Sequence, residues 1–400
     1  MELDMSDRQS KPRRRTVLRT ASATVLTGIS FTGTASAESP GERKSDGNST
    51  NSKNNNSKPD LYIEGLDVDT KLKVESLDEA ELALYSTDSK PNHDRIIGAI
   101  NAGTAIGFIG ESATKHLVGE LQQRKPADVT TSVSRSSALD SDIEYSFGYL
   151  LSNNRSPISA IAYPCNDGCL DLHIRYSSKG SDSDAFGAAL NDFETAVNVE
   201  QEGLTKDQQQ WDDEFEKVHT IHTHTTNCSG GELYEVQECR INADNPQFLA
   251  WKYTDEMRPG NIDESECSPW TGRNNDDAYR RMEYHDGDLH SWGPDTTESE
   301  STVTVGISAD GPSASWSYAI PDVVINNNTG STNIVSWEHD VLDGLIEDTA
   351  FTSRPGVTVK YSAEPTMVEY DYDIEFTFDG PWRHSWTIEA DGSGAAYIDY

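Results

Sequence analysis

The stretch LDLHIRY, residues 170–176, decides the fold because apolar and polar residues alternate along it. Its first, third, fifth and seventh residues are apolar or aromatic, and the residues between them are charged or carry an imidazole. Successive side chains of an extended chain point to opposite faces, so this period of two predicts a half-buried β-strand. Residues 143–151 and 158–163 predict two further strands just before it.

Helical patterns lie on both sides of these strands. In residues 184–202, Phe186, Leu190 and Phe193 recur at helical spacing, which predicts a helix. Residues 96–110 are apolar and rich in glycine, and together with residues 112–124 they predict a buried helical hairpin. The small-residue spacing in residues 103–107 leaves a membrane-active segment as the alternative. We therefore expect residues 61–228 to form a mixed α/β domain.

The second half of the chain has only strand patterns. Short alternating runs are separated by turn residues, such as the Asp-Gly pairs at 310–311, 379–380 and 391–392. The runs are residues 303–307, 314–318, 334–337, 357–361, 368–378 and 384–389. They predict a β-sandwich or jelly-roll-like domain over residues 229–400. The expected fold class is thus α+β, with an N-terminal mixed α/β part followed by an all-β C-terminal domain.

The N-terminus has the pattern of an export signal. Arg14 and Arg15 stand side by side, a modest apolar run follows, and small residues close it before Ala37. This order resembles a twin-arginine (Tat) signal, which implies export of the folded chain by the Tat translocase and removal of residues 1–37. Residues 38–60 are rich in Ser, Asn, Lys and Gly and predict a disordered linker. No apolar run reaches the about 20 residues that span a bilayer, so we expect a secreted, extracellular protein without a transmembrane anchor.

The charge excludes one class of partner. The chain has 68 acidic and 32 basic residues, a net charge of -36. Such a chain repels the phosphate backbone, so we expect no binding to nucleic acid. Salt at about 1 M shortens the Debye length to about 3 Å and removes most of the self-repulsion. The acidic excess and the Tat signal together resemble haloarchaeal exported proteins.

Five cysteines occur, at positions 165, 169, 228, 239 and 267. Disulfides are the default in an exported protein. The spacings make Cys165–Cys169 and Cys228–Cys239 the candidate pairs and leave Cys267 over. A bond between Cys228 and Cys267 is equally open, and the odd number leaves at least one thiol free, metal-bound or joined to another chain.

A first histidine cluster could bind a metal ion. His219, His222 and His224 fall within six residues. His219 and His222 would share a face on a helix, whereas His222 and His224 would share one on a strand. Either pair could bind Zn²⁺ with a third or fourth ligand, and an exposed strand edge is the alternative.

A second cluster offers both imidazoles and carboxylates. His285, Asp286, Asp288 and His290 lie within six residues. The carboxylates could bind Ca²⁺ and the histidines Zn²⁺. A solvated hairpin turn around Asp-Gly-Asp is the alternative.

Tryptophans are concentrated after residue 250. Trp270, Trp292 and Trp382 lie near Pro, Gly or polar residues and are candidates for a ligand-binding rim, since exposed aromatic faces stack on sugar rings. Trp316, Trp337 and Trp386 are expected to fill the core.

Three functions are compatible with these patterns. The leading hypothesis is a secreted, salt-adapted, non-enzymatic protein that binds a carbohydrate, a cell surface or another protein. The second is a metal-dependent secreted hydrolase that uses one of the histidine clusters. The third is a membrane-active antimicrobial (halocin-like) protein. No catalytic residue can be named from the sequence, because it contains no H-E-x-x-H, G-x-S-x-G or P-loop motif.

Overall fold

The computed structural model describes residues 59–68, 70, 72–122, 145–165, 168–177, 182–199, 211, 215–227, 231–259, 274–297, 302–319, 323–341, 350–380 and 384–398. The predicted signal, with Arg14, Arg15 and Ala37, lies outside these residues, as does most of the predicted linker. Within the described residues, nineteen strands are accompanied by three α-helices and one short 3-10 helix, Leu77–Glu79.

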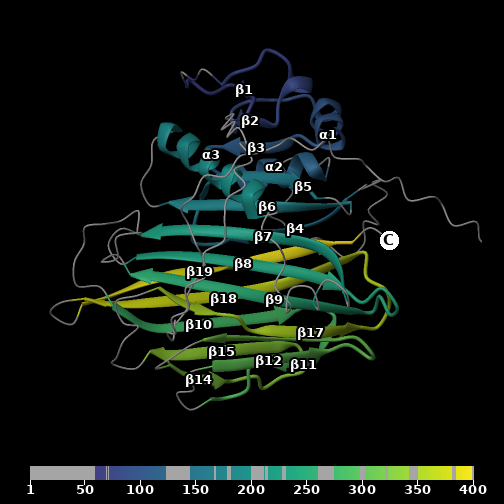
Figure 1. Ribbon diagram of the computed structural model, residues 1–400, viewed down its shortest axis with the longest axis vertical. Helices are drawn as coiled ribbons and strands as arrows, with labels where there is room; N and C mark the ends of the chain where they lie inside the picture. Colours follow the sequence, from purple (N-terminus) through teal and green to yellow (C-terminus); the bar gives the residue numbers. More distant parts are fainter. Residues whose placement is uncertain are drawn as a thin grey trace, which may run out of the picture.

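One end of the molecule is a mixed sheet. Its strands are the parallel β1 (Leu61–Glu64), β2 (Leu82–Ser86) and β3 (Ala105–Ile109), then the antiparallel β5 (Pro157–Pro164) and β6 (Cys169–Ser177) (Figure 1). The predicted strand at residues 170–176 is confirmed as β6, in which Leu172 and Ile174 are buried and Asp171 and His173 only half-buried.

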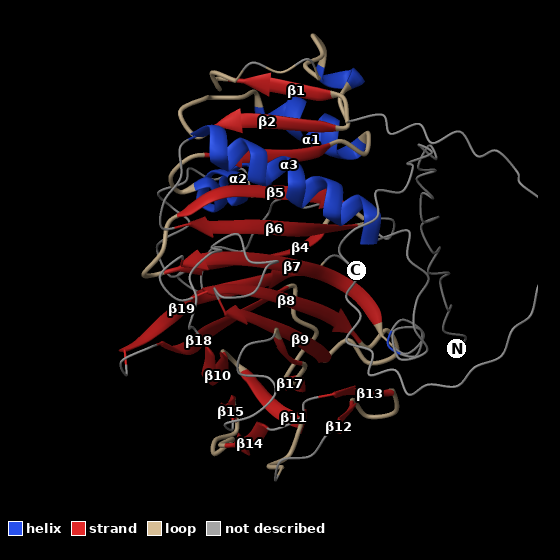
Figure 2. Cartoon of the chain, turned by 60° about the vertical axis from the view of Figure 1, so that its left-hand side comes forward, coloured by secondary structure: helices blue, strands red, loops and turns tan. Residues whose placement is uncertain are grey.

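Helices cover both faces of this end (Figure 2). α1 (His93–Asn101) and α2 (Ala113–Leu121) bury Ile96 and Leu117 against one face, and α3 (Asp182–Val199) buries Phe186 and Phe193 against the other. Asn92 caps α1 by accepting a hydrogen bond from a backbone N–H of its first turn. Within the described part of the chain, no helix combines the length and the apolar character needed to cross a membrane.

The sheet divides at β6, which pairs in parallel with two different strands. The first branch is β7 (Glu216–Asn227), β8 (Gly231–Ile241), β9 (Phe248–Pro259), β17 (Gly356–Tyr361) and β11 (Gly287–Gly293), with β16 (Phe351–Ser353) also on β9. The second branch is β4 (Ser146–Ser152), β19 (His384–Tyr397), β18 (Met367–Gly380), β10 (Asn274–Tyr284), β15 (Ile334–Val341) and β14 (Val323–Asn327).

The two branches face each other and enclose the main core. The ring centroids of Trp251 on β9 and Tyr284 on β10 lie 4.8 Å apart, and the Tyr370 hydroxyl on β18 donates to Gln237 on β8 at 3.2 Å. A separate hairpin, β12 (Thr302–Ser308) and β13 (Ser313–Ala319), adds buried Val305 and Trp316 to this core.

The predicted fold class is wrong. Among the described residues, seventeen strands form one continuous sheet, so the chain is mostly β rather than a mixed α/β part followed by a separate sandwich or jelly roll. β4, from the first half, pairs with β19, from the last residues, between Gly392 and Tyr397. Local periodicity predicts strands but not their partners, which explains the error. The predicted boundary at residue 228 falls between the paired strands β7 and β8, and the division into two domains stays a prediction.

The predicted helical hairpin over residues 96–124 also needs correction. α1 ends at Asn101, Gly103 adopts a φ of 93°, and residues 105–109 form the fully buried strand β3. Gly103 allows the left-handed conformation with which the chain leaves the helix. The second predicted helix is confirmed as α2.

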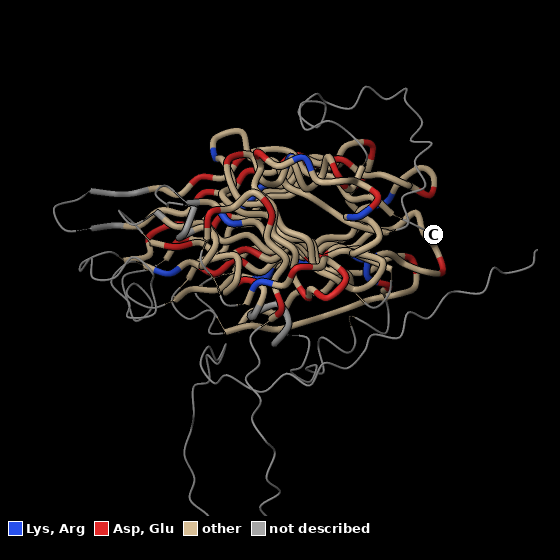
Figure 3. Tube along the Cα trace, turned by 90° about the horizontal axis from the view of Figure 1, so that it is seen from above, with Lys and Arg blue, Asp and Glu red and all other residues tan. Residues whose placement is uncertain are grey.

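Acidic residues outnumber basic ones along the chain (Figure 3). On the outer face of β18 and β19, Asp373 stands directly opposite Asp391, and Glu375 opposite Glu389. Burial, followed by the repulsion of neighbouring carboxylates, raises the pKa of Asp373 and Glu375. Like charges in direct cross-strand contact destabilise a sheet, and dissolved salt screens this repulsion.

Candidate functional site

A surface pocket of about 310 Å³ lies beside the turn that joins β10 to β11. Nine residues line it: His285, Asp286, Tyr361, Ser362, Ala363, Glu364, Pro365, Met367 and Glu369. The volume is at the lower end of the range for small-molecule sites. Two of the nine, His285 and Asp286, were candidates from the sequence, and seven come from the distant residues 361–369, which run from the end of β17 into the start of β18.

Backbone hydrogen bonds hold the walls of the pocket in place. The N–H of His285 donates to the carbonyl of Glu369 at 2.9 Å, and the N–H of Tyr361 donates to the carbonyl of Gln247 at 2.8 Å. Asp286 has a φ of 59°, a left-handed conformation that Asp and Asn adopt more readily than most residues. The Asp-Gly sequence therefore forms a tight turn at the pocket wall.

Tyr361 lines the pocket, but its hydroxyl is buried away from solvent. Its side chain is 5% exposed, and its hydroxyl forms no hydrogen bond with a described residue. A Cβ atom added to Gly287 would lie 2.8 Å from Tyr361 Cζ, the atom that bears the hydroxyl. The hydroxyl end of the ring therefore lies under the Asp286–Gly287 turn. Burial, above all, raises the pKa of this phenol well above its usual value, so it stays protonated.

The pocket is acidic. Asp286, Glu364 and Glu369 supply three carboxyl groups, and no Lys or Arg is among the nine lining residues. His285 Nε2 lies 3.0 Å from a carboxylate oxygen of Asp371, next to the pocket. Both partners are more than one-third exposed, so this pair orients the imidazole and contributes little to stability.

The other half of the second cluster points elsewhere. Asp288 and His290 are exposed on β11, where Asp288 is opposite Lys360 and the His290 ring packs edge-on against Phe248. His285 and Asp286 therefore line the pocket, whereas Asp288 and His290 lie on the exposed part of β11. Calcium or zinc binding by this cluster stays a prediction.

The first histidine cluster lies on β7, so the strand alternative applies. His222 and His224 share one face, but His222 stacks on His173 with ring centroids 4.1 Å apart and His224 stacks on Tyr234 at 3.9 Å. His219 is completely buried on the other face. Zinc binding here is untested, and the three imidazoles do not converge in this structure.

We expect His219 to make the fold sensitive to acid. Burial lowers its pKa to about 3, so the imidazole stays neutral in the folded chain while it takes up a proton in the unfolded chain. The free energy of unfolding should therefore fall as pH decreases from about 6.5, by about 1.4 kcal/mol per pH unit from this residue. His219→Gln should flatten the dependence in urea unfolding measured between pH 7 and pH 4. Parallel curves for the two proteins would contradict this account.

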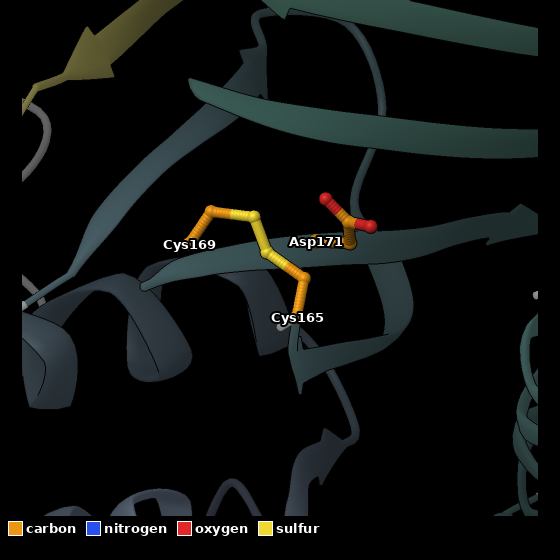
Figure 4. A group of neighbouring side chains, drawn as sticks. All are labelled: Cys165, Cys169 and Asp171. Atoms are coloured by element: carbon orange, nitrogen blue, oxygen red, sulfur yellow. A yellow bond between two sulfur atoms is a disulfide. The ribbon is translucent and has the colours of Figure 1, made fainter. Parts of the chain in front are cut away.

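The disulfide predicted between Cys165 and Cys169 is confirmed and joins the end of β5 to the start of β6 (Figure 4). Their sulfur atoms lie near the Asp171 carboxylate, which binds Lys217 at 2.5 Å. Among the described residues, these are three ligand-type atoms within 4.8 Å, but the two sulfurs are bonded to each other and are therefore not thiolate ligands.

Cys239 is a free, buried thiol on β8, opposite His219 on β7, rather than half of the predicted Cys228–Cys239 bond. Cys228 and Cys267 lie outside the described residues, so the alternative pair between them stays open.

The predictions for the tryptophans have different outcomes. Trp292 is 36% exposed, as expected of a rim residue, whereas Trp316 and Trp337 are buried in the core as predicted. Trp270, Trp382 and the side chain of Trp386 lie outside the described part of the structure.

Sequence reasoning missed a buried ionic network between the branches. Arg280 on β10 donates to Asp255 on β9 at 2.7 Å and to Glu235 on β8 at 2.6 Å, and its side chain is 1% exposed. Thr223 and Gln237 also donate to Glu235. Charged residues at inward positions of β8, β9 and β10 were the signal, and the 68 acidic residues of the chain obscured it.

Comparison with known proteins assigns this chain to no family. No family model matches the chain, and neither does any curated protein. Among solved structures, the Clostridium perfringens delta-toxin is similar with a TM-score of 0.28 and 12% identity, over 46% of this chain and 86% of the toxin. A structure described as a pore forming protein has a TM-score of 0.24 and 9% identity, over 44% of this chain and 88% of its own. These similarities are too low to support a functional argument.

Proposed function

We propose that this chain is an exported, salt-adapted, non-enzymatic binding protein and that the pocket beside the β10–β11 turn is its ligand site. The observation that carries the proposal is the pocket itself, about 310 Å³ in volume, whose nine lining residues include three carboxyl groups and no Lys or Arg. Carboxylates accept charge-assisted hydrogen bonds, so they can orient a ligand that carries hydrogen-bond donors.

Two features of the chain support export and folding in concentrated salt. The twin-arginine pattern at Arg14 and Arg15 supports export, and the facing carboxylates of β18 and β19 support folding in concentrated salt, where their repulsion is screened. The carbohydrate or cell-surface partner expected from the sequence remains a proposal, for which exposed Trp292 is the available rim residue.

A ligand screen tests the proposal. The mature chain, purified in multimolar KCl, is mixed with a panel of soluble sugars, amino acids and short amines, and binding is followed by ligand-observed NMR. We expect at least one class to bind and Asp286→Asn to weaken it about tenfold or more, as expected for loss of a charge-assisted hydrogen bond. Asparagine tolerates the left-handed backbone at this position, so the turn is retained.

The control is Asp310→Asn. Asp310 is also exposed, also precedes a glycine in a turn and has a φ of 43°, but it does not line the pocket. Equal binding by both variants and the unsubstituted chain would overturn the proposed site.

Two further measurements on the same purified protein test the two alternative functions, a metal-dependent hydrolase and a membrane-active protein. A metal-dependent hydrolase would carry stoichiometric metal, lost on substitution of His222 or His285. A membrane-active antimicrobial protein would release dye from lipid vesicles at high salt. Either result, without pocket-dependent binding, would replace the proposed function.

A further inference from the structure

We infer that Asn154, and not Asn327, is an attachment site for an N-linked glycan, which is transferred from a sugar donor activated by a lipid phosphate. The inference does not depend on the pocket. It rests on the exposure of one acceptor motif in the folded chain, on the hydrogen bonds that engage another, and on the export of a folded chain that Arg14 and Arg15 indicate.

Five segments of the sequence match the acceptor motif Asn-x-Ser/Thr, in which x is not proline. They begin at Asn48, Asn55, Asn154, Asn227 and Asn327. The structure describes all three residues of two of these motifs, 154–156 and 327–329. These two can therefore be compared as acceptors in the folded chain.

The first motif forms part of the turn between β4 and β5. Asn154 and Ser156 are both exposed. Among the described residues, neither Asn154 Nδ2 nor the Ser156 hydroxyl has a hydrogen-bond partner. The Ser152 hydroxyl donates to Asn154 Oδ1 at 2.8 Å, which leaves the nitrogen free to react.

The neighbouring residues hold this turn against the sheet. The middle residue of the motif, Arg155, is half-buried, and burial, above all, lowers the pKa of its guanidinium group. The preceding residue, Asn153, donates to Asp391 on β19 from its backbone at 2.8 Å and from its side chain at 3.1 Å. The turn is thus anchored while the first and third residues of the motif face solvent.

The second motif has the same residue types, but its acceptor groups are engaged. Asn327 Nδ2 donates to the carbonyl of Pro294 at 2.8 Å, and Asn327 Oδ1 accepts from the N–H of Thr329 at 3.1 Å. The Thr329 hydroxyl accepts from the N–H of Ser336 at 3.4 Å. Asn327 and Thr329 are also only half-exposed. A transferase that meets the folded chain would have to break these hydrogen bonds, whereas the first motif is open to it.

The reaction replaces one of the two N–H bonds of the Asn154 side-chain amide. Nδ2 forms a bond to the anomeric carbon of the donor sugar as the bond from that carbon to the phosphate oxygen breaks. The lipid phosphate leaves, and the nitrogen gives up one proton to a base of the transferase. The product keeps Oδ1 and its hydrogen bond from Ser152, so the turn needs no rearrangement.

Peptide mass spectrometry of the full chain, secreted by its natural host, tests the inference. We expect whole sugar residues on the peptide that contains Asn154 and none on the peptide that contains Asn327. Asn154→Gln and Ser156→Ala should each abolish the addition, because each destroys the motif. Ser156→Thr is the matched control, since it keeps both the hydroxyl and the motif and should retain the sugar.

The order of folding and export supplies a second test. If residues 1–37 are replaced by a signal that exports the unfolded chain, the contacts of Asn327 are not yet formed when the transferase acts. We then expect sugar on Asn327 as well as on Asn154.

Two results would overturn the inference: an Asn154 without sugar in the natural product, or equal occupancy of Asn154 and Asn327 there. An Asn327 that stays unmodified after export of the unfolded chain would overturn the structural explanation, because its folded contacts could not then be what protects it.

Discussion

Arg280→Met is expected to cost about 3–5 kcal/mol of folding free energy, the range for breaking a buried ion pair from one side. Arg280 lies between the two branches of the sheet and is the cation that faces both Asp255 and Glu235. Without it, the two buried carboxylates lose their counter-charge and must stay charged at high cost or take up protons. Urea unfolding at neutral pH in multimolar salt measures the loss.

Arg281→Met is the matched control. Arg281 is the next residue on the same strand, points to the other face and pairs with Glu283, where both side chains are about one-third exposed. Its loss should cost no more than about 1 kcal/mol. If the two substitutions cost the same, the network is not what joins the branches. Adding Glu235→Gln and Asp255→Asn to Arg280→Met should restore part of the stability, because the unpaired charges are then removed.

Gly148→Ala is expected to destabilise the fold by roughly 1–3 kcal/mol, the usual cost of overpacking a core. A Cβ atom at this position on β4 would lie 2.2 Å from His219 Nε2 and within 2.5 Å of two ring carbons. The His219 side chain is completely buried, so the ring has little room to move away. Thermal or urea unfolding measures the change.

Gly187→Ala in α3 serves as the comparison. No heavy atom lies within 4 Å of the Cβ that it would add, and the residue is exposed on a helix. This substitution should therefore stabilise the chain by about 0.5–1 kcal/mol. His219→Ala combined with Gly148→Ala should be less harmful than the sum of the single changes, because the two side chains share one space. Additive effects would show that the contact is not the cause.

The candidate site was partly visible in the sequence. His285 and Asp286 stood out because several metal- and proton-binding side chains fell within six residues around an Asp-Gly turn. Tyr361 did not stand out, since a tyrosine at the end of an alternating run is an ordinary core residue. It reaches the pocket because β17 pairs antiparallel with β11, which places Tyr361 opposite Gly287.

Side-chain periodicity, which acts over a few residues, predicts the local elements. These are the strand at residues 170–176, the helices α2 and α3, and the short strands after residue 300. Long-range packing establishes that β6 has two parallel partners, that β4 pairs with β19, and that Arg280 contacts Asp255 and Glu235. Strand register and pairing depend on packing between residues far apart in the chain, and that information is absent from any single stretch.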